Sequence, residues 1–178
     1  TCKNGSIFFA IKGKNYDGNK FIEEAIARGA KTIINNKFEG FKGNVLFLKH
    51  NSPRHLMAIA ANNLFESKVS NLIGVTGTNG KSSIADFYVQ ILNLNNLKSA
   101  SIGTLGVKYE GLKVQTKNTT LDIISTNKIF KKLSLKNIKN IIMEASSHGL
   151  HQHRLDGIKF DIGIFTNLSR DHLDYHKT

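Results

Sequence analysis

Residues 74–83 read Gly-Val-Thr-Gly-Thr-Asn-Gly-Lys-Ser-Ser and directly follow the apolar pair Leu72-Ile73. A strand that leads into a glycine-rich turn ending in Lys-Ser is a common way to hold the phosphates of a nucleotide. The glycines let backbone N–H groups converge on phosphate oxygens, and the lysine adds a positive charge. The stretch therefore predicts a phosphate-binding loop between a strand and a helix, with Lys81 and Ser82 at its end.

The loop departs from the strict pattern at one position. That pattern has a glycine five places before the Gly-Lys pair, where this chain has Val75. A bare Gly-Lys-Ser is common by chance, but here it lies between an apolar strand and an amphipathic helix. The hydroxyl of Ser82 is available for Mg²⁺, and the helix that begins near Ser82 would present its positive N-terminal end to an anion.

Composition limits the class of protein. The chain has 178 residues, enough for one ordinary domain or two small ones, and 40% of them are hydrophobic, which supports a packed core. Its one cysteine, Cys2, excludes an internal disulfide and fits a reducing cytosol. No long apolar run or signal peptide is evident, so no membrane insertion is expected.

The formal net charge of +12 suggests an anionic partner, either a nucleic acid or a polyanionic small molecule. The lysines are spread along the chain, and only Lys131 and Lys132 are adjacent. Aromatic residues do not alternate with basic ones as they do in platforms that stack nucleic-acid bases. The pattern argues against a nucleic-acid-binding module. It leaves two explanations of the charge, a small anionic ligand and a solvated surface.

Up to residue 65, apolar runs alternate with segments of helical spacing, as in a small α/β unit. Strands are predicted at Ser6–Ile11, which is expected to be buried, Lys31–Asn35 and Val45–Leu48, and helices at Asn19–Gly29 and from Pro53, capped by Ser52, to Phe65. The polar stretch 66–71 is the predicted linker. Residues 1–68 are therefore expected to form one domain, and residues 69–178 the first part of a second.

The alternation restarts after the linker. Strands are predicted at Leu72–Thr76, Lys98–Ile102, Asn140–Ala145 and Phe160–Thr166, helices at Ser82–Asn93 and from the cap Asp122 to Leu133, and a hairpin from Val107–Tyr109 and Leu112–Gln115 through Glu110-Gly111. The runs 140–145 and 160–166 are continuously apolar, as strands buried inside a mostly parallel sheet are. The predicted fold class is α/β, with a small N-terminal α/β domain followed by a phosphate-loop domain built on a mostly parallel sheet.

Two strand ends carry polar side chains that such a loop requires. In doubly wound sheets, ligand-binding groups lie at the carboxyl ends of neighbouring strands. Glu144 ends one apolar run, and residues 166–172 follow another. A carboxylate at this place favours a role with Mg²⁺ over a structural one.

Two groups of histidines lie close together in sequence, at positions 148, 151 and 153 and at positions 172 and 176. Such groups can bind zinc, but no cysteine lies nearby and the spacing is irregular. Helix capping, hydrogen bonding or contact with a substrate is the favoured interpretation.

Several segments together resemble one family. The loop at 74–82 is similar to the ATP-binding loop of the Mur ligases. Other segments resemble the branch of that family that adds the third amino acid to the peptidoglycan precursor, the UDP-N-acetylmuramoyl-tripeptide synthetases. These segments are Asn118-Thr119-Thr120, Met143-Glu-Ala-Ser-Ser-His-Gly-Leu150, Gln152-His153-Arg154 and Phe165-Thr-Asn-Leu-Ser-Arg-Asp-His-Leu-Asp-Tyr-His176. The opening segment Gly5-Ser-Ile-Phe-Phe-Ala-Ile-Lys-Gly13 with Asp17-Gly18 resembles the uridine-binding first domain of the family.

The resemblance implies an ATP-dependent amide ligase of peptidoglycan synthesis. ATP would phosphorylate the side-chain carboxylate of D-glutamate in UDP-N-acetylmuramoyl-L-alanyl-D-glutamate, and the amine of a diamino acid would attack the acyl phosphate. Its ligands would be ATP, Mg²⁺, the UDP-muramoyl-dipeptide and a diamino acid, with meso-diaminopimelate favoured over L-lysine. The family also implies a cytoplasmic monomer that binds no nucleic acid.

The resemblance further implies a role for each matching residue. The loop residues would hold ATP: Gly77, Thr78, Asn79, Gly80, Lys81, Ser82 and Ser83. Catalysis is assigned to Lys81, Glu144 and His172, and Mg²⁺ to Ser82, Glu144 and His172. The UDP-muramoyl-dipeptide would contact Asn118, Thr119, Thr120, Ser146, Gln152 and Arg154, and its uridine would contact Lys14, Asn15 and Tyr16.

Parts of the family pattern are not found in this chain. The family has an Asp-Ser-Arg segment before the matching start, and after the match a carbamylated lysine and a third, amino-acid-binding domain. The chain is therefore expected to cover most of the first domain and about half of the central one. A sheet cut in this way is expected to leave an exposed edge and uncovered apolar strands.

Other functions compete with this interpretation. One is another Mur ligase or a folylpolyglutamate-type ligase, and a second is a generic phosphate-loop phosphotransferase. The segment 144–154 argues against both. From a different class, a basic nucleic-acid-binding module would explain the charge and would bind RNA or DNA in a strongly salt-dependent way.

We expect the 178-residue chain by itself to show no ligase turnover. The reason is that the predicted carbamylated lysine and amino-acid-binding domain are outside it. Phosphate release is to be measured with ATP, the UDP-muramoyl-dipeptide and a diamino acid. Release that depends on all three would contradict this expectation.

Overall fold

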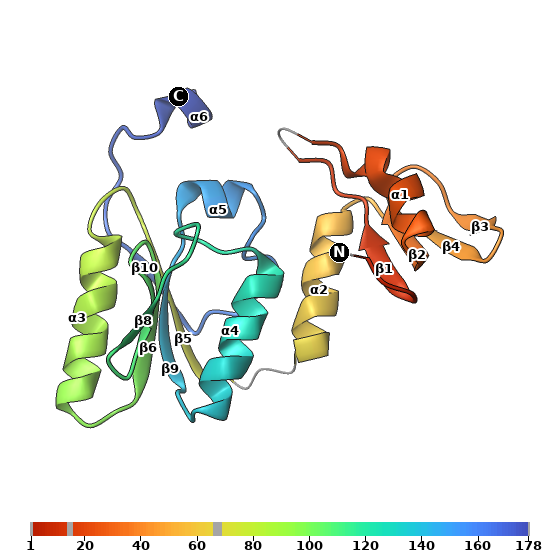
Figure 1. The fold of residues 1–178 in the computed structure, drawn as a ribbon. Coiled ribbons are helices and arrows are strands. Elements are labelled where there is room, and N and C mark those ends of the chain that lie inside the picture. Colours follow the sequence, from red (N-terminus) through yellow and green to blue (C-terminus); the bar gives the residue numbers. More distant parts are fainter. Residues whose placement is uncertain (1, 14–15, 66–68, 178) are drawn as a thin grey trace. The chain divides into compact units, whose positions relative to one another are not determined.

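The computed structural model describes residues 2–13, 16–65 and 69–177 (Figure 1). The chain divides into two compact units, Thr1–Ala60 and Ala61–Thr178. Lys14, Asn15 and residues 66–68 of the predicted linker lie outside the described residues.

The first unit contains a four-stranded sheet in the order β1-β2-β4-β3. Its strands are β1 (Ser6–Phe9), β2 (Ala30–Asn35), β3 (Gly40–Lys42) and β4 (Val45–Lys49). Strands β1, β2 and β4 are parallel, and β3 runs antiparallel to β4. The prediction missed β3 because it has only three residues, all exposed, and so carries no apolar pattern.

Two of the helical segments that begin in the first unit have a side-chain cap. The predicted helix 19–29 is a 3₁₀ turn, η1 (Gly18–Phe21), followed by α1 (Ile22–Ala27). The side chain of Asp17 accepts a hydrogen bond from the Asn19 N–H at 2.9 Å. Helix α2 (Pro53–Phe65) begins at its proline as predicted, and the Ser52 hydroxyl accepts from the His55 N–H at 3.3 Å.

The second unit is built on a six-stranded sheet in the order β10-β5-β9-β6-β7-β8. Its strands are β5 (Asn71–Thr76), β6 (Ser99–Gly103), β7 (Gly106–Tyr109), β8 (Leu112–Val114), β9 (Asn140–Glu144) and β10 (Ile162–Phe165). Strands β10, β5, β9 and β6 are parallel. The predicted hairpin of β7 and β8 is confirmed, and both turn residues, Glu110 and Gly111, have positive φ.

Helices cover both faces of this sheet. Helix α3 (Lys81–Leu94) lies on one face and α4 (Ile123–Leu135) on the other (Figure 1). Alternate residues of β9 point to opposite faces: Ile142 packs with Ala85 of α3, while Ile141 and Met143 pack in the cluster that contains Leu133 of α4. Burial on both faces explains why β9 is continuously apolar.

Two apolar runs that were predicted to be buried are edge strands. Strand β1 ends at Phe9, two residues earlier than predicted, and Ile7 is 54% exposed. Strand β10 begins at Ile162, its one strand neighbour among the described residues is β5, and Phe165 is 64% exposed. Burial was wrongly predicted because an apolar run does not reveal whether a strand lies at an edge or whether other elements cover its faces. The expected uncovered apolar strand is confirmed in β10.

Two short helices follow strand ends and were not predicted. Helix α5 (Ser147–His151) begins after Ser146, whose hydroxyl accepts from the Gly149 N–H at 3.1 Å. Helix α6 (Leu173–His176) begins after His172, which has a left-handed φ of 51°. Elements of four or five residues are too short to show helical periodicity. The predicted cap of α4 is confirmed, because Asp122 accepts from the Ile124 and Ser125 N–H groups.

Within the described residues, no helix is both long enough and apolar enough to cross a membrane.

Leu133 and Leu135 of α4 provide a test of the core. Leu133 is fully buried, whereas Leu135 is 80% exposed. We expect Leu133→Ala to lower the free energy of unfolding by about 2–5 kcal/mol, because it leaves a cavity under the sheet. Leu135→Ala is the matched control, with a change within about 0.5 kcal/mol. Urea denaturation measures both, and equal losses would contradict the packing.

Candidate active site

The predicted phosphate-binding loop, Gly77–Ser83, connects β5 to α3 and includes the first residues of that helix. It is called the phosphate-type loop below. Strand β5 ends at Thr76 and α3 begins at Lys81. The Lys81 Nζ turns back over the loop and donates to the carbonyl oxygens of Gly77 at 2.7 Å and Thr78 at 2.8 Å. Helix α3 has no side-chain cap at Gly80, so its first N–H groups remain available to an anion.

The segment after β10 holds this loop from the side. The Thr78 N–H donates to the Asn167 carbonyl at 3.0 Å, and the Asn79 N–H to the Asn167 Oδ1 at 3.0 Å. The Thr166 hydroxyl donates to the Asn79 carbonyl at 2.7 Å, and the Ser169 N–H to the Thr78 hydroxyl at 2.9 Å. The sheet therefore positions the loop through a neighbouring strand end, which gives Asn167 and its neighbours a structural role that the sequence did not reveal.

Glu144, at the end of β9, is the most buried charged group of the site, with 2% exposure. The Ser82 Oγ lies 2.9 Å from each of its carboxylate oxygens. Thr104 donates to it twice, from its N–H to Oε1 and from its hydroxyl to Oε2, both at 3.0 Å. No basic side chain of the described residues forms an ion pair with Glu144. A buried carboxylate held only by neutral donors is a place where a cation would stabilise the protein.

A second network joins the predicted substrate residues to Glu144. The Thr120 hydroxyl donates to the Glu144 carbonyl oxygen at 2.9 Å and lies 3.0 Å from the Ser146 hydroxyl. Arg154 donates from Nη1 to the Thr120 carbonyl at 2.7 Å and from Nη2 to the Gln152 Oε1 at 2.6 Å. Thus four of the predicted substrate residues belong to one hydrogen-bonded group.

The other predicted substrate residues are placed differently. The Thr119 hydroxyl lies 3.1 Å from that of Thr104, and Asn118 accepts through its carbonyl from Thr116 at 3.2 Å. Tyr16 belongs to the first unit and is 75% exposed. Lys14 and Asn15 lie outside the described residues.

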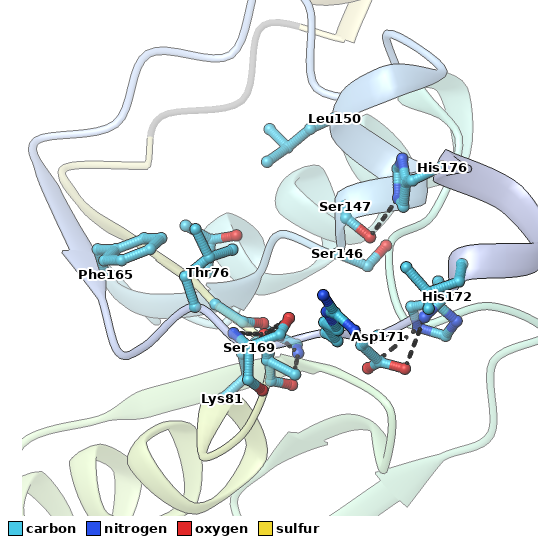
Figure 2. A pocket seen from close by; sticks show the side chains of 15 residues that line it. Thr76, Lys81, Ser146, Ser147, Leu150, Phe165, Ser169, Asp171, His172 and His176 are labelled. Atoms are coloured by element: carbon cyan, nitrogen blue, oxygen red, sulfur yellow. Dashed lines mark hydrogen bonds and ion pairs between the residues drawn. The ribbon is translucent and has the colours of Figure 1, made fainter. Parts of the chain in front are cut away.

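A cavity of about 780 Å³ opens beside the loop (Figure 2). Its lining brings Lys81 together with His172 and Ser146. The remaining lining residues come from the end of β5, the phosphate-type loop, α5, the end of β10, the segment that leads into α6, and α6 itself: Thr76, Gly77, Thr78, Ser147, Leu150, Phe165, Leu168, Ser169, Arg170, Asp171, Leu173 and His176. Ser82, Glu144, Gln152 and Arg154 do not line it. The cavity has the size of sites that bind small molecules.

Aromatic side chains of α5, of α6 and of His172 pack against one another, and two of them, His172 and His176, line this cavity. The ring centre of His148 lies 4.6 Å from that of His172 and 4.0 Å from that of Tyr175. Burial lowers the pKa of His148, and charge repulsion from His172 and His176 lowers it further. Among the described residues, no group of three or more His, Cys, Asp or Glu side chains is arranged to hold a metal ion. His148, His151, His172 and His176 meet with Tyr175 as a packed aromatic cluster.

Sequence reasoning missed Thr104, which contacts both Glu144 and Thr119. A signal for it exists. Thr104 directly follows β6, a parallel strand next to β9, so the rule that selected Glu144 also applies to it.

Comparison with known families agrees with this architecture. Residues 75–178 match the Mur ligase middle domain, and residues 1–65 match the domain described as Mur ligase family, catalytic domain. The chain belongs to the Mur ligase family.

Curated relatives point to one branch of the Mur ligases. A UDP-N-acetylmuramoyl-L-alanyl-D-glutamate–2,6-diaminopimelate ligase of Rickettsia rickettsii is 44% identical, over 100% of this chain and 38% of the relative. The ligase of the same name from Chelativorans sp. (strain BNC1) is 41% identical, over 98% of this chain and 36% of the relative. The chain thus spans little more than a third of the length of these curated relatives.

Solved structures show the same fold. A UDP-N-acetylmuramoyl-L-alanyl-D-glutamate–2,6-diaminopimelate ligase superimposes with a TM-score of 0.79 at 31% identity, covering 99% of this chain and 36% of that one. The MurF ligase of Thermotoga maritima, solved in complex with ADP, gives a TM-score of 0.58 at 20% identity and covers 99% of this chain and 38% of that one. The second likeness concerns the fold alone.

Gly77 and Gly80 allow a test of the loop geometry. Both have positive φ, 130° and 86°. A Cβ on Gly77 would also collide with the Thr166 side chain and the Asn167 backbone, whereas a Cβ on Gly80 would meet open space. We expect Gly80→Ala to cost about 1–2 kcal/mol of stability from backbone strain. Gly77→Ala is expected to cost more and to release the segment after β10.

Hydrogen exchange is the measurement for this pair. The Ser169 amide, which donates to the Thr78 hydroxyl, is expected to exchange faster in Gly77→Ala than in Gly80→Ala. Equal exchange in the two variants would contradict the proposed contact between loop and strand end.

Proposed function

We propose that this chain supplies the ATP-binding part and much of the acceptor-binding part of a ligase that adds 2,6-diaminopimelate to UDP-N-acetylmuramoyl-L-alanyl-D-glutamate. The observation that carries the proposal is the position of Glu144. Its carboxylate accepts a hydrogen bond from Ser82 of the phosphate-type loop, and its backbone carbonyl accepts one from Thr120, a predicted substrate residue. The relatives that are 41–44% identical bear the name of this ligase, which supports the assignment.

In this proposal the loop residues Gly77–Ser83 bind the phosphates of ATP. The uncapped N-terminus of α3 supports this role, because its N–H groups and dipole favour an anion. The Lys81 Nζ, which lines the cavity and donates to the Gly77 and Thr78 carbonyl oxygens, would neutralise charge on the transferred phosphoryl group.

The residues around Glu144 fit Mg²⁺. A hydroxyl and a carboxylate in direct contact, with no basic partner among the described side chains, are oxygen ligands of the kind that Mg²⁺ binds together with phosphate oxygens. Ser82 and Glu144 would hold one ion and His172 would serve a second. When bound, Mg²⁺ would stabilise the negative charge that accompanies phosphoryl transfer.

The acceptor residues would orient the muramoyl-dipeptide. Thr120, Ser146, Gln152 and Arg154 already hold one another in place, so little ordering is required when the acceptor binds. Asn118 and Thr119 would complete this contact, and Lys14, Asn15 and Tyr16 are assigned to the uridine.

The D-glutamate carboxylate would attack the γ-phosphorus of ATP and release ADP. The amine of the diamino acid would then displace phosphate from the acyl phosphate, forming the amide and losing a proton.

Several finer assignments belong to the same proposal. The names of the relatives favour diaminopimelate over L-lysine as the amino acid. Residues 1–68 would form the UDP-substrate domain and residues 69–178 the beginning of the ATP domain. The ligase would work in the cytoplasm as a monomer and without nucleic acid, and its anionic ligands would use part of the net charge of +12.

Nucleotide binding tests the first half of the proposal. We expect the 178-residue chain to bind ADP more tightly with Mg²⁺ than with EDTA. Lys81→Ala should weaken Mg²⁺-ADP binding about tenfold or more, because a hydrogen bond to a charged group is worth ~1.5–3 kcal/mol. Lys128→Ala, which removes an exposed charge from α4, is the matched control. Calorimetric titration and thermal unfolding of each variant separate lost binding from lost folding.

Calorimetric titration also tests the second half of the proposal, the binding of the acceptor substrate. Saturable binding of UDP-N-acetylmuramoyl-L-alanyl-D-glutamate without binding of folate supports the proposed branch of the family. Folate binding would favour a folylpolyglutamate-type ligase. Strongly salt-dependent RNA binding that ATP does not displace would overturn the assignment in favour of a nucleic-acid-binding module.

A further inference from the structure

We propose that Thr104 is a positioning residue that orients the Glu144 carboxylate. Through Thr119, Thr104 also connects this carboxylate to the residues assigned to the UDP-muramoyl-dipeptide. The inference rests on the proposed function, because it assigns Glu144 to the metal and Thr119 to the acceptor. It adds a residue to which neither the sequence motifs nor the family matches give a role.

The first argument is the way in which Thr104 holds the carboxylate. Its N–H donates to Oε1 and its hydroxyl to Oε2, each at 3.0 Å. The terminal torsion of a glutamate is broad, so a carboxylate is free to rotate unless both oxygens are bound. A residue that donates separately to the two oxygens fixes the plane of the group. Ser82 alone lies at equal distance from both oxygens and would select that plane less sharply.

The residue before Thr104 supports the same arrangement. A Cβ on Gly103 would collide with the carboxyl group of Glu144. The backbone of β6 can therefore approach Glu144 closely only because position 103 is glycine, and this approach brings the Thr104 N–H within hydrogen-bonding distance. Gly103 and Thr104 together form the cradle in which the carboxylate lies.

The second argument concerns proton direction. The Thr104 hydroxyl has one proton, and an ionised carboxylate can only accept. Since Thr104 donates to Glu144, the 3.1 Å contact between Thr104 and Thr119 must be donated by Thr119. The hydrogen bonds thus run in one direction, from Thr119 through Thr104 to Glu144. If the bound UDP-muramoyl-dipeptide accepts a hydrogen bond from the Thr119 hydroxyl, the bond from Thr119 to Thr104 is weakened. The hydrogen bond that Thr104 donates to the Glu144 carboxylate then changes in strength.

The hydroxyl of Thr104 has little part in the core. Thr104 is exposed at the end of β6, whereas the preceding residues of the strand are buried. Replacing the hydroxyl by a methyl group in Thr104→Val should therefore leave folding intact and remove one donor to Glu144. Thr104→Ser keeps the donor and removes only the methyl group, and so serves as the matched control.

The experiment compares wild type, Thr104→Val and Thr104→Ser in the 178-residue chain. The probe is ADP, titrated with Mg²⁺ and with EDTA. We expect Thr104→Val to weaken binding about tenfold with Mg²⁺ and less than about twofold with EDTA, as for the loss of a hydrogen bond to a charged group. Thr104→Ser should stay within about threefold of wild type. A general loss of folding would weaken both titrations together.

A crystal structure of Thr104→Val provides the second measurement. We expect the Glu144 carboxylate to rotate and to lose its symmetrical contact with Ser82. A carboxylate in its original place, or a Thr104→Ser variant as weak as Thr104→Val, overturns the inference. If wild type fails to bind the UDP-muramoyl-dipeptide, the proposed function fails while the Mg²⁺-ADP comparison still stands. If wild-type ADP binding does not depend on Mg²⁺, the metal role fails and the orientation of Glu144 in the crystal decides the positioning role.

Discussion

A buried carboxylate must be hydrogen-bonded or paired with a cation, because removing it from water otherwise costs several kcal/mol. Glu144 meets this requirement with donors from two directions. Ser82 comes from the first turn of α3, which follows β5, and Thr104 directly follows β6. Since β5 and β6 are the two neighbours of β9 in the sheet, the carboxylate lies between them. Its burial therefore depends on the sheet order, and the geometry of the site depends on its burial.

The same glutamate also connects the two halves of the site. Its side chain faces the phosphate-type loop, and its carbonyl accepts from Thr120, which in turn contacts Ser146. In the proposed function, one strand end thus carries the nucleotide side on its carboxylate and the acceptor side on its backbone. A chemistry that must bring a phosphoryl donor and an acceptor together requires such a connection.

Most of the fold was predictable because its signals are local. The apolar alternation of strands and helices, the cap at Asp122 and the turn at Glu110-Gly111 depend only on neighbouring residues. The errors occurred where a local pattern is insufficient. The runs at β1 and β10 are apolar as buried strands are, but edge position is a property of the sheet. Helices α5 and α6 were missed because four or five residues cannot show a period.

The sequence by itself determined the phosphate-type loop, the strand that ends at Glu144 and the membership of the Mur ligase family, because motifs and strand ends are contiguous in the chain. Only the tertiary structure decided that Thr104 shares Glu144 with Ser82 and that Asn167 holds the loop. These residues are separated by tens of positions, and the parallel sheet brings their strand ends to one edge. No local pattern encodes which strands become neighbours.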